Sequence, residues 1–280
     1  MYFILDKDMI EKSIVAYLPH PNRGFAPTVP LAEIVNAILY KLKGGVHWRL
    51  LPVKALFSDK VICWQSVYYH YRKWCISQAW KNCWIKFLEV HKDKLDLSSV
   101  DLDGSHTPAK RGGDTVEYQG RKKTKTTNSL YLSDRQGLPL AMSEPVAGNH
   151  NDLFNIEVQF EVVTDTLEEA NISVNVLFLN ADAGFDSKEF RSSCNEKQIN
   201  ANICFNKRNS NSDRDEYFDQ KLYDERYAVE RTNAWMDSYR SLLNRFDTTT
   251  ESWKGFNYLS FIVIAIKKFN KNKNLNHFIL

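Results

Sequence analysis

Several common signals are missing from this sequence of 280 residues, and each absence excludes a class of protein. The five cysteines are odd in number and include no C-x-x-C pair, which indicates the reduced thiols of a cytosolic protein rather than disulfides or a zinc site. The longest apolar run, residues 258–266, is about half as long as a membrane span requires. The N-terminal stretch MYFILDKDMI lacks the basic start of a signal peptide.

Motifs of several enzyme classes are also absent, among them G-x-S-x-G, the Walker loop, G-x-G-x-x-G and H-E-x-x-H. The formal net charge is only +3, so overall charge does not identify a nucleic-acid binder and local clusters must be examined. Hydrophobic residues make up 43% of the chain and aromatic residues 13%, which supplies a well-packed globular core.

Residues 1–95 predict a helical domain. Apolar residues recur at helical spacing in 6–18, 31–42, 64–75 and 78–90, and Gly44–Gly45 ends the second of these segments. The outer face of the third segment carries Tyr69, Arg72 and Lys73. Helices joined by turns with a basic and aromatic outer face suit helix-turn-helix-like DNA docking. The alternative is an ordinary helical pair that binds nothing.

Residues 96–280 predict a second domain of mixed α/β class. Short strands are expected near residues 96–106, at 121–134 and at 137–148, with Gly137 at a hairpin turn. The nearly continuous apolar stretch 174–181 is typical of a central strand covered on both faces. Helices are expected at 153–167, from Ser187, and over 226–246, with a further strand at NANICF.

Acidic residues follow two of these strands. Asp103 ends the first strand, Asp182 comes directly after the apolar strand, and Glu230 lies on the last predicted helix, with Tyr223 and Arg226 on the same stripe. Two Asp and one Glu that converge in space would bind a pair of Mg²⁺ ions, a site suited to phosphodiester chemistry. Each acid has an alternative interpretation as a cap or a surface charge, and Asp101 shares a strand face with Asp103, so either could be the ligand.

Several segments together resemble bacterial insertion-sequence transposases of the Asp-Asp-Glu (DDE) type in the IS-four/IS-five superfamily. The stretches RGFAPTVPLAEIVNAILYKLKGGVHWRLLP and VYYHYRKW are similar to the N-terminal DNA-binding region of that family. DGSHTPAKRGG, GLPLAMSEPVAGNHND and ADAGFDS resemble its catalytic segments, and YDERYAVER matches its signature of Tyr, Arg and Glu. The family pattern continues with a basic residue seven places after the Glu, where this chain has Asp237, which puts one phosphate contact in doubt.

The resemblance implies an RNase H-like catalytic domain in which Asp103, Asp182 and Glu230 hold two Mg²⁺ ions, with Mn²⁺ as a possible substitute. Tyr223 and Arg226 would steady the scissile phosphate. The implied activity is cleavage at the terminal inverted repeats of a transposon, followed by joining of the ends to target DNA. The implied partners are double-stranded DNA and, in the synaptic complex, a second copy of the chain; the implied location is the bacterial cytoplasm, in association with the nucleoid.

Basic residues concentrate in one segment of the second domain and predict contact with DNA phosphates. They are Lys110, Arg111, Arg121, Lys122, Lys123 and Lys125. Two other hypotheses stay open from the sequence. A catalytically inactive DNA-binding relative would bind without cutting, and a general RNase H-like nuclease would cut DNA that lacks the repeats.

Overall fold

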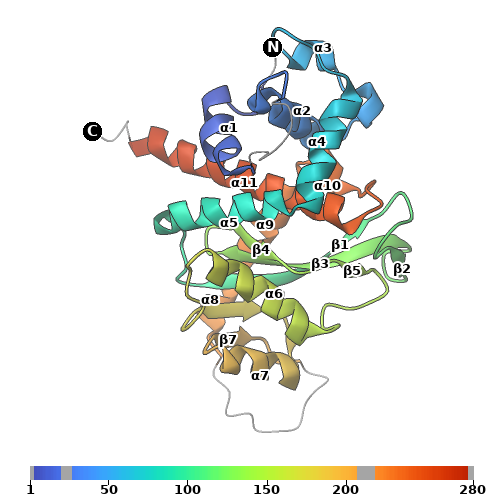
Figure 1. Ribbon diagram of the computed structural model, residues 1–280. Helices are drawn as coiled ribbons and strands as arrows, with labels where there is room; N and C mark the ends of the chain where they lie inside the picture. Colours follow the sequence, from blue (N-terminus) through green and yellow to red (C-terminus); the bar gives the residue numbers. More distant parts are fainter. Residues whose placement is uncertain (1–2, 20–26, 207–217, 277–280) are drawn as a thin grey trace. The chain divides into compact units, whose positions relative to one another are not determined.

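The computed structural model describes residues 3–19, 27–206 and 218–276, and its contacts divide the chain into two compact units (Figure 1). One unit comprises Met1–Phe87 together with Met236–Leu280, and the other comprises Leu88–Trp235. The last segment of the chain therefore clusters with the N-terminal helices. The functional division predicted near residue 95, into a DNA-binding and a catalytic domain, stays a prediction.

The first unit is helical, as the sequence predicts. Its elements are α1 (Lys7–Ser13), η1 (Val15–Tyr17), α2 (Leu31–Gly44), η2 (Trp48–Leu50), α3 (Val53–Leu56), α4 (Trp64–Ile76), most of α5 (Ala79–His91), α10 (Arg240–Leu243) and α11 (Thr250–Asn276). Gly45 ends α2 in the left-handed conformation, with φ of +66°, and its N–H bonds to the carbonyl of Lys41. The first residues of the family-like stretch that begins at Arg23 lie outside the described part of the chain.

Large aromatic side chains fill the core of this unit. The rings of Tyr71 on α4 and Phe256 on α11 stack with centroids 4.4 Å apart, and Trp80 and Trp253 are almost fully buried. The apolar run 258–266, for which the sequence reading assigned no element, lies in the middle of α11 and is buried. In the described ranges, no helix is long and apolar enough to cross a membrane.

The second unit is built on one mixed sheet. Its strands are β1 (Val100–Pro108), β2 (Glu117–Gln119), β3 (Thr124–Asp134), β4 (Pro139–Met142), β5 (Val146–Ala147), β6 (Phe178–Ala181) and β7 (Asn200–Ile203), in the order β2-β3-β1-β6-β7, with β4 and β5 also paired to β3. β1 is antiparallel to β3 and parallel to β6, and β6 is parallel to β7. This order, antiparallel strands on one side of β1 and parallel strands on the other, confirms the expected RNase H-like mixed α/β fold.

Helices complete the second unit. They are η3 (Lys92–Lys94), α6 (Ile156–Glu169), η4 (Ala183–Phe185), α7 (Lys188–Glu196), α8 (Gln220–Asp224) and α9 (Tyr227–Asp237). α6 packs on β3 and β4, and α8 packs on β6 and β7. Ser187 is the N-cap of α7, because its hydroxyl accepts the N–H of Phe190 at 3.1 Å.

Three sequence expectations need correction. The helix predicted over 226–246 is broken into α9 and α10 at Ser238, and Tyr223 lies on a separate short helix, α8. The strand predicted at 174–181 begins only at Phe178, because Val174 and Val176 lie in the turn that precedes it. The strand expected at 121–134 begins only at Thr124, because residues 120–123 form the hairpin turn from β2, a strand that the sequence did not predict.

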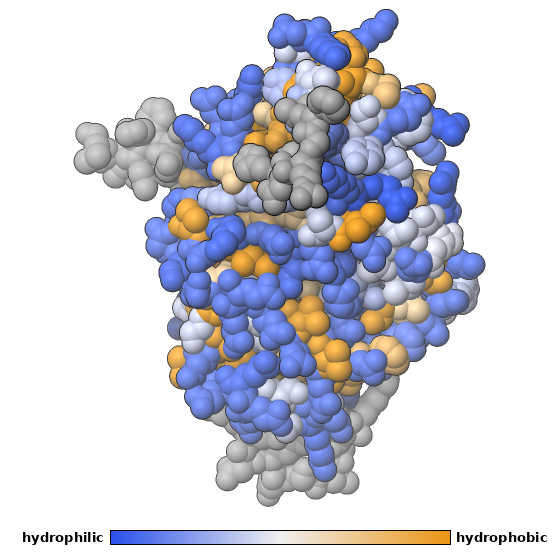
Figure 2. Space-filling view, viewed as in Figure 1, coloured by the Kyte–Doolittle hydropathy of each residue, from blue (hydrophilic) through white to orange (hydrophobic). Residues whose placement is uncertain are grey.

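Hydrophobic side chains are mostly internal. On the face drawn in Figure 2, hydrophilic residues predominate and hydrophobic residues form separate patches. The buried residues of α6, α7 and the sheet include Phe160 and Phe190, whose rings meet edge to face at 5.0 Å. The two parallel strands that carry the predicted acids are therefore held by a packed core.

Candidate active site

Asp103 lies on β1, the strand with a neighbour on each side. It shares a face with Asp101, but the two carboxylates differ in environment. Asp101 is 1% exposed and accepts a hydrogen bond from the Asn180 amide at 2.9 Å. Asp103 is partly exposed, and its Oδ2 lies 3.5 Å from the amide nitrogen of Asn233 on α9. Of the two acids that the sequence left as alternatives, Asp103 is the accessible one.

Asp182 follows β6 directly and caps η4, where its Oδ1 accepts the N–H of Gly184 at 2.7 Å. β1 and β6 are parallel, with Asp101 opposite Asn180. Continuing this register by two residues brings Asp103 level with Asp182, which lies just beyond the end of β6. Asp103 does not end its strand as the sequence predicted, because β1 stays paired with β3 as far as Pro108. The cap interpretation of Asp182 and a role in the site are therefore compatible, since its second carboxylate oxygen is not engaged by that turn.

The charges around Asp103 identify its neighbours. Burial raises its pKa to about 6, Arg226 acts to lower the pKa, and the charges of Asp182 and Asp152 raise it. The Tyr223 pKa is raised by burial, lowered by Arg226 and raised by Asp182. The guanidinium of Arg226 lies 5.4 Å from the centre of the Tyr223 ring. Four of the five predicted catalytic residues thus influence one another electrostatically.

Glu230 is not gathered with the two aspartates. It lies exposed on the first turn of α9, and within the described ranges no three His, Cys, Asp or Glu side chains are grouped closely enough to hold an ion. Asn233, which contacts Asp103, follows Glu230 by three residues, so both side chains project from one face of α9. α9 therefore presents the face that bears Glu230 toward β1, but the Glu230 carboxylate does not contact the two aspartates.

The turn between β3 and β4 fixes the position of α9. Thr232 donates its hydroxyl to the carbonyl of Gly137 at 2.7 Å, and Arg231 donates to the carbonyl of Gln136 at 3.1 Å. Gly137 has φ of +82°, and a Cβ there would lie 2.8 Å from the carbonyl oxygen of Ala228. Arg231, which follows Glu230 directly, is thus engaged with the turn.

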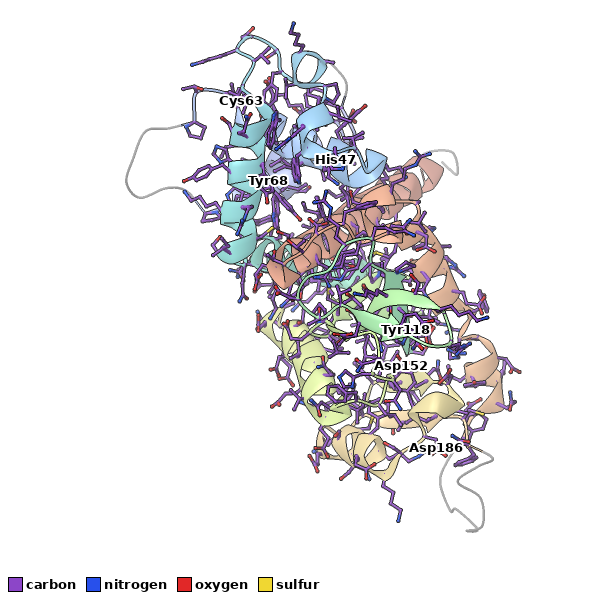
Figure 3. All side chains as sticks on the ribbon, turned by 90° about the vertical axis from the view of Figure 1, so that its right-hand side faces the viewer. His47, Cys63, Tyr68, Tyr118, Asp152 and Asp186 are labelled. Carbon is purple, nitrogen blue, oxygen red and sulfur yellow. The ribbon has the colours of Figure 1, made fainter. Side chains whose placement is uncertain are left out.

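A polar cluster that the sequence reading did not assign lies next to Asp103. Asp152, labelled in Figure 3, accepts a hydrogen bond from Asn128 at 2.8 Å, and its Oδ1 lies 3.9 Å from His106 Nε2. A Cβ on Gly104 would lie 2.1 Å from the same oxygen, so the Asp152 carboxylate rests against the backbone of β1. Burial lowers the His106 pKa, whereas Asp152 raises it. The tetrapeptide NHND at 149–152 contained the signal, but no spacing rule assigns a role to Asp152.

The predicted DNA-binding residues form two groups, one in each unit. Tyr69, Arg72 and Lys73 are exposed on α4, and 63% of the Tyr69 surface is accessible to solvent. The second group surrounds the β2–β3 hairpin, beside the exposed ring of Tyr118 (Figure 3). Its exposed members are Lys110, Arg111, Arg121, Lys122, Lys123 and Lys125.

Comparisons with known proteins match two segments of the chain. Residues 10–84 match the family DUF4096, described as a transposase of the IS4/5 family, and residues 179–267 match a transposase DDE domain. No curated protein sequence shows significant similarity to the chain. The second match includes Asp182, Tyr223, Arg226 and Glu230.

Solved structures of Mos1 transposase are also similar, but only weakly. The Mos1 strand transfer complex is 11% identical over 86% of this chain and 78% of that chain, with a TM-score of 0.33. The Mos1 paired-end complex with the left transposon end is 13% identical over 86% and 79% of the two chains, with a TM-score of 0.30. The fold class follows from the strand order described above. The two family matches follow one another along a single chain, and the protein belongs to the DDE transposases of the IS4/IS5 type.

Proposed function

We propose that the protein recognises the terminal inverted repeats of its element, cuts the DNA phosphodiesters there and joins the ends to target DNA. The observation that carries the proposal is the pair Asp103, within β1, and Asp182, directly after the parallel neighbour β6, with Tyr223 and Arg226 in the same electrostatic neighbourhood. Carboxylates beside a guanidinium provide oxygen donors for a cation and a binding group for a phosphate.

The carboxylate oxygens of Asp103 and Asp182 are suitable ligands for a hard divalent cation, and a third carboxylate would complete the set. The charge of Asp182 disfavours ionisation of Asp103, a repulsion that a bound cation would relieve. Glu230 would add the third carboxylate from the face of α9 that Asn233 turns toward Asp103. When bound, two Mg²⁺ or Mn²⁺ ions would supply activation of the attacking oxygen and stabilisation of the leaving oxygen.

The remaining roles belong to the side chains of the chain itself. Arg226 would bind the scissile phosphate through two parallel N–H groups, and the Tyr223 hydroxyl would donate to another phosphate oxygen. Burial of Asp103 and the packing of β1 against β3 and β6 keep its carboxylate fixed before DNA arrives. The exposed basic residues of α4 and of the hairpin would neutralise phosphates of double-stranded DNA, and a second copy of the chain would hold the other transposon end.

The experiment is cleavage of a labelled DNA that carries the element's inverted repeats, with Mg²⁺, by the parent and by Asp182→Ala. We expect the variant to lose cleavage by about 10³-fold or more while it still binds the DNA, since one donor of a shared site is gone. Asp165→Ala, which removes an exposed carboxylate from α6, is the matched control and should cut like the parent.

The outcomes separate the competing hypotheses. Binding without cleavage by the parent, under any divalent ion, would identify an inactive DNA-binding relative. Equal cutting of DNA without the repeats would identify a general nuclease. An Asp182→Ala protein that cuts as fast as the parent would show that the carboxylates are not the site.

A further inference from the structure

A row of buried polar side chains runs from β1, at the centre of the sheet in the second unit, to β7 at its edge. Asp101 on β1 stands opposite Asn180 on β6, and Asn180 stands opposite Asn202 on β7. All three are 1% exposed. Because paired residues on adjacent strands point to the same face, the three side chains meet side by side.

Hydrogen bonds run along this row in one direction. The amide of Asn202 donates to Asn180 Oδ1 at 2.8 Å, and the amide of Asn180 donates to Asp101 Oδ1 at 2.9 Å. At the other end, Asn202 accepts the backbone N–H of Asp219 at 2.8 Å and donates to the Asp219 carbonyl at 3.0 Å. Each amide thus uses both its donor and its acceptor, and the row ends on a carboxylate.

The row joins the elements that carry the proposed catalytic groups. Asp103 follows Asp101 by two residues within β1, and Asp182 follows Asn180 by two residues, directly after β6. Asp219 is the N-cap of α8, where its carboxylate accepts the N–H of Leu222 at 2.9 Å, one residue before Tyr223. The row therefore ties β1, β6 and β7 to the start of the segment that leads to Arg226.

Apolar residues would fill these positions at lower cost if packing were the only requirement. Buried amides and carboxylates lose hydration that only well-formed hydrogen bonds offset, and the flanking residues Leu102, Leu179 and Ile203 show that the strands accept apolar side chains. A hydrogen-bonded network that spans four elements restricts their relative register, which apolar contacts do only loosely.

We infer that Asp101, Asn180 and Asn202 are positioning residues for the active site, which hold the backbone at Asp103, the backbone at Asp182 and the N-terminus of α8 in fixed register. The inference rests on the proposed function for its catalytic consequence. Its geometric part, the coupling of the row to α8, does not depend on catalysis.

The test exchanges the donor and the acceptor residue of the hydrogen bond between Asn180 and Asp101. Asn180→Asp removes the donor to Asp101 and sets two carboxylates against each other. The double variant Asp101→Asn with Asn180→Asp restores every bond, because the new Asn donates to the new Asp, which still accepts from Asn202. Thr166→Val on α6, which loses a buried hydroxyl bond to the Val162 carbonyl, is the control for a general loss of stability.

Two measurements are made on the full chain. Hydrogen exchange should be faster for the amides of residues 219–223 in Asn180→Asp, return toward the parent in the double variant, and stay unchanged in Thr166→Val. The rate of repeat-end cleavage at saturating DNA and Mg²⁺ should fall about 10–100-fold in Asn180→Asp, as for other partners that orient metal ligands, and recover in the double variant.

Unchanged exchange at 219–223 in Asn180→Asp would overturn the inference whether or not the protein cleaves DNA. Altered exchange with an unchanged cleavage rate would overturn it as well. If the parent itself cuts no repeat DNA, the proposed function fails, while the exchange data still decide the coupling. Should Asn180→Asp not fold, Asn202→Ser, which shortens the link to Asp219, replaces it with the same expectations.

Discussion

At the scale of single residues, environment distinguishes acids that look equivalent in the sequence. Asp101 and Asp103 are two residues apart on one face of β1, yet Asp101 ends a buried hydrogen-bond row while Asp103 is partly exposed beside Asn233. Burial raises the pKa of each to about 6. Its buried hydrogen bond suits Asp101 to hold the strands of the sheet together, whereas its partial exposure suits Asp103 to bind a cation.

The raised pKa of Asp103 predicts how the stability of the metal-free protein depends on pH. Its folded pKa of about 6 lies above the unfolded value, so between those values the folded state binds more protons. Stability should therefore rise as pH falls from about 7.5 to about 5, and Asp103→Asn should reduce this rise by on the order of 1 kcal/mol. Asp101 and Asp134, shifted in the same direction, keep part of the dependence in the variant.

Urea unfolding in the presence of a chelator, at both pH values, measures this difference. Asp165→Ala, an exposed carboxylate on α6, should leave the pH dependence as it is in the parent. Identical pH dependence in Asp103→Asn and the parent would contradict the prediction.

At the scale of elements, the segment that carries Glu230 is placed by a turn distant in sequence. α9 is a separate helix whose Thr232 and Arg231 bond to the β3–β4 turn at Gly137 and Gln136. Local periodicity predicts one continuous helix over 226–246, because it contains no information on the contacts of α9 with the β3–β4 turn or on the break at Ser238. The orientation of the α9 face that bears Glu230 therefore depends on a hairpin that lies 95 residues earlier in the chain.

Gly137→Ala tests this docking. The residue has φ of +82°, and the added Cβ would lie 2.8 Å from the Ala228 carbonyl, so both the turn and α9 must shift. We expect a loss of about 1–3 kcal/mol in the free energy of unfolding and a lower cleavage rate. Gly120→Ala, with nothing within 4 Å of its added Cβ, is the control and should change stability little. A Gly137→Ala protein as stable as the parent would show that α9 does not depend on this contact.

At the scale of the whole molecule, charge is distributed unevenly. The formal net charge is +3, yet six exposed basic residues surround one hairpin in the second unit, and Arg72 and Lys73 lie on α4 in the first. A weak overall charge combined with dense local clusters favours contact with DNA at defined surfaces over uniform attraction.

Neutralising the hairpin turn tests this distribution. If Arg121, Lys122 and Lys123 each contact a phosphate, their replacement by Ala should weaken DNA binding and reduce the slope of log K against log salt by about 2–3. Replacing Lys7 and Lys12, exposed on α1, should leave the slope within error of the parent. DNA titrations followed by fluorescence anisotropy at several salt concentrations measure the slope. An unchanged slope in the hairpin variant would show that the hairpin surface does not contact DNA phosphates.

The sequence by itself determined the fold class, most helices of the N-terminal region, the hairpin at Gly137 and the family, because these depend on local periodicity, turn chemistry and motif spacing. Only the tertiary structure decided that Asp103 rather than Asp101 is accessible, that Asn180 and Asn202 link the strands to α8, and that the helix predicted over 226–246 is broken. Those features depend on strand register and on contacts between residues far apart in the chain. A one-dimensional pattern contains neither.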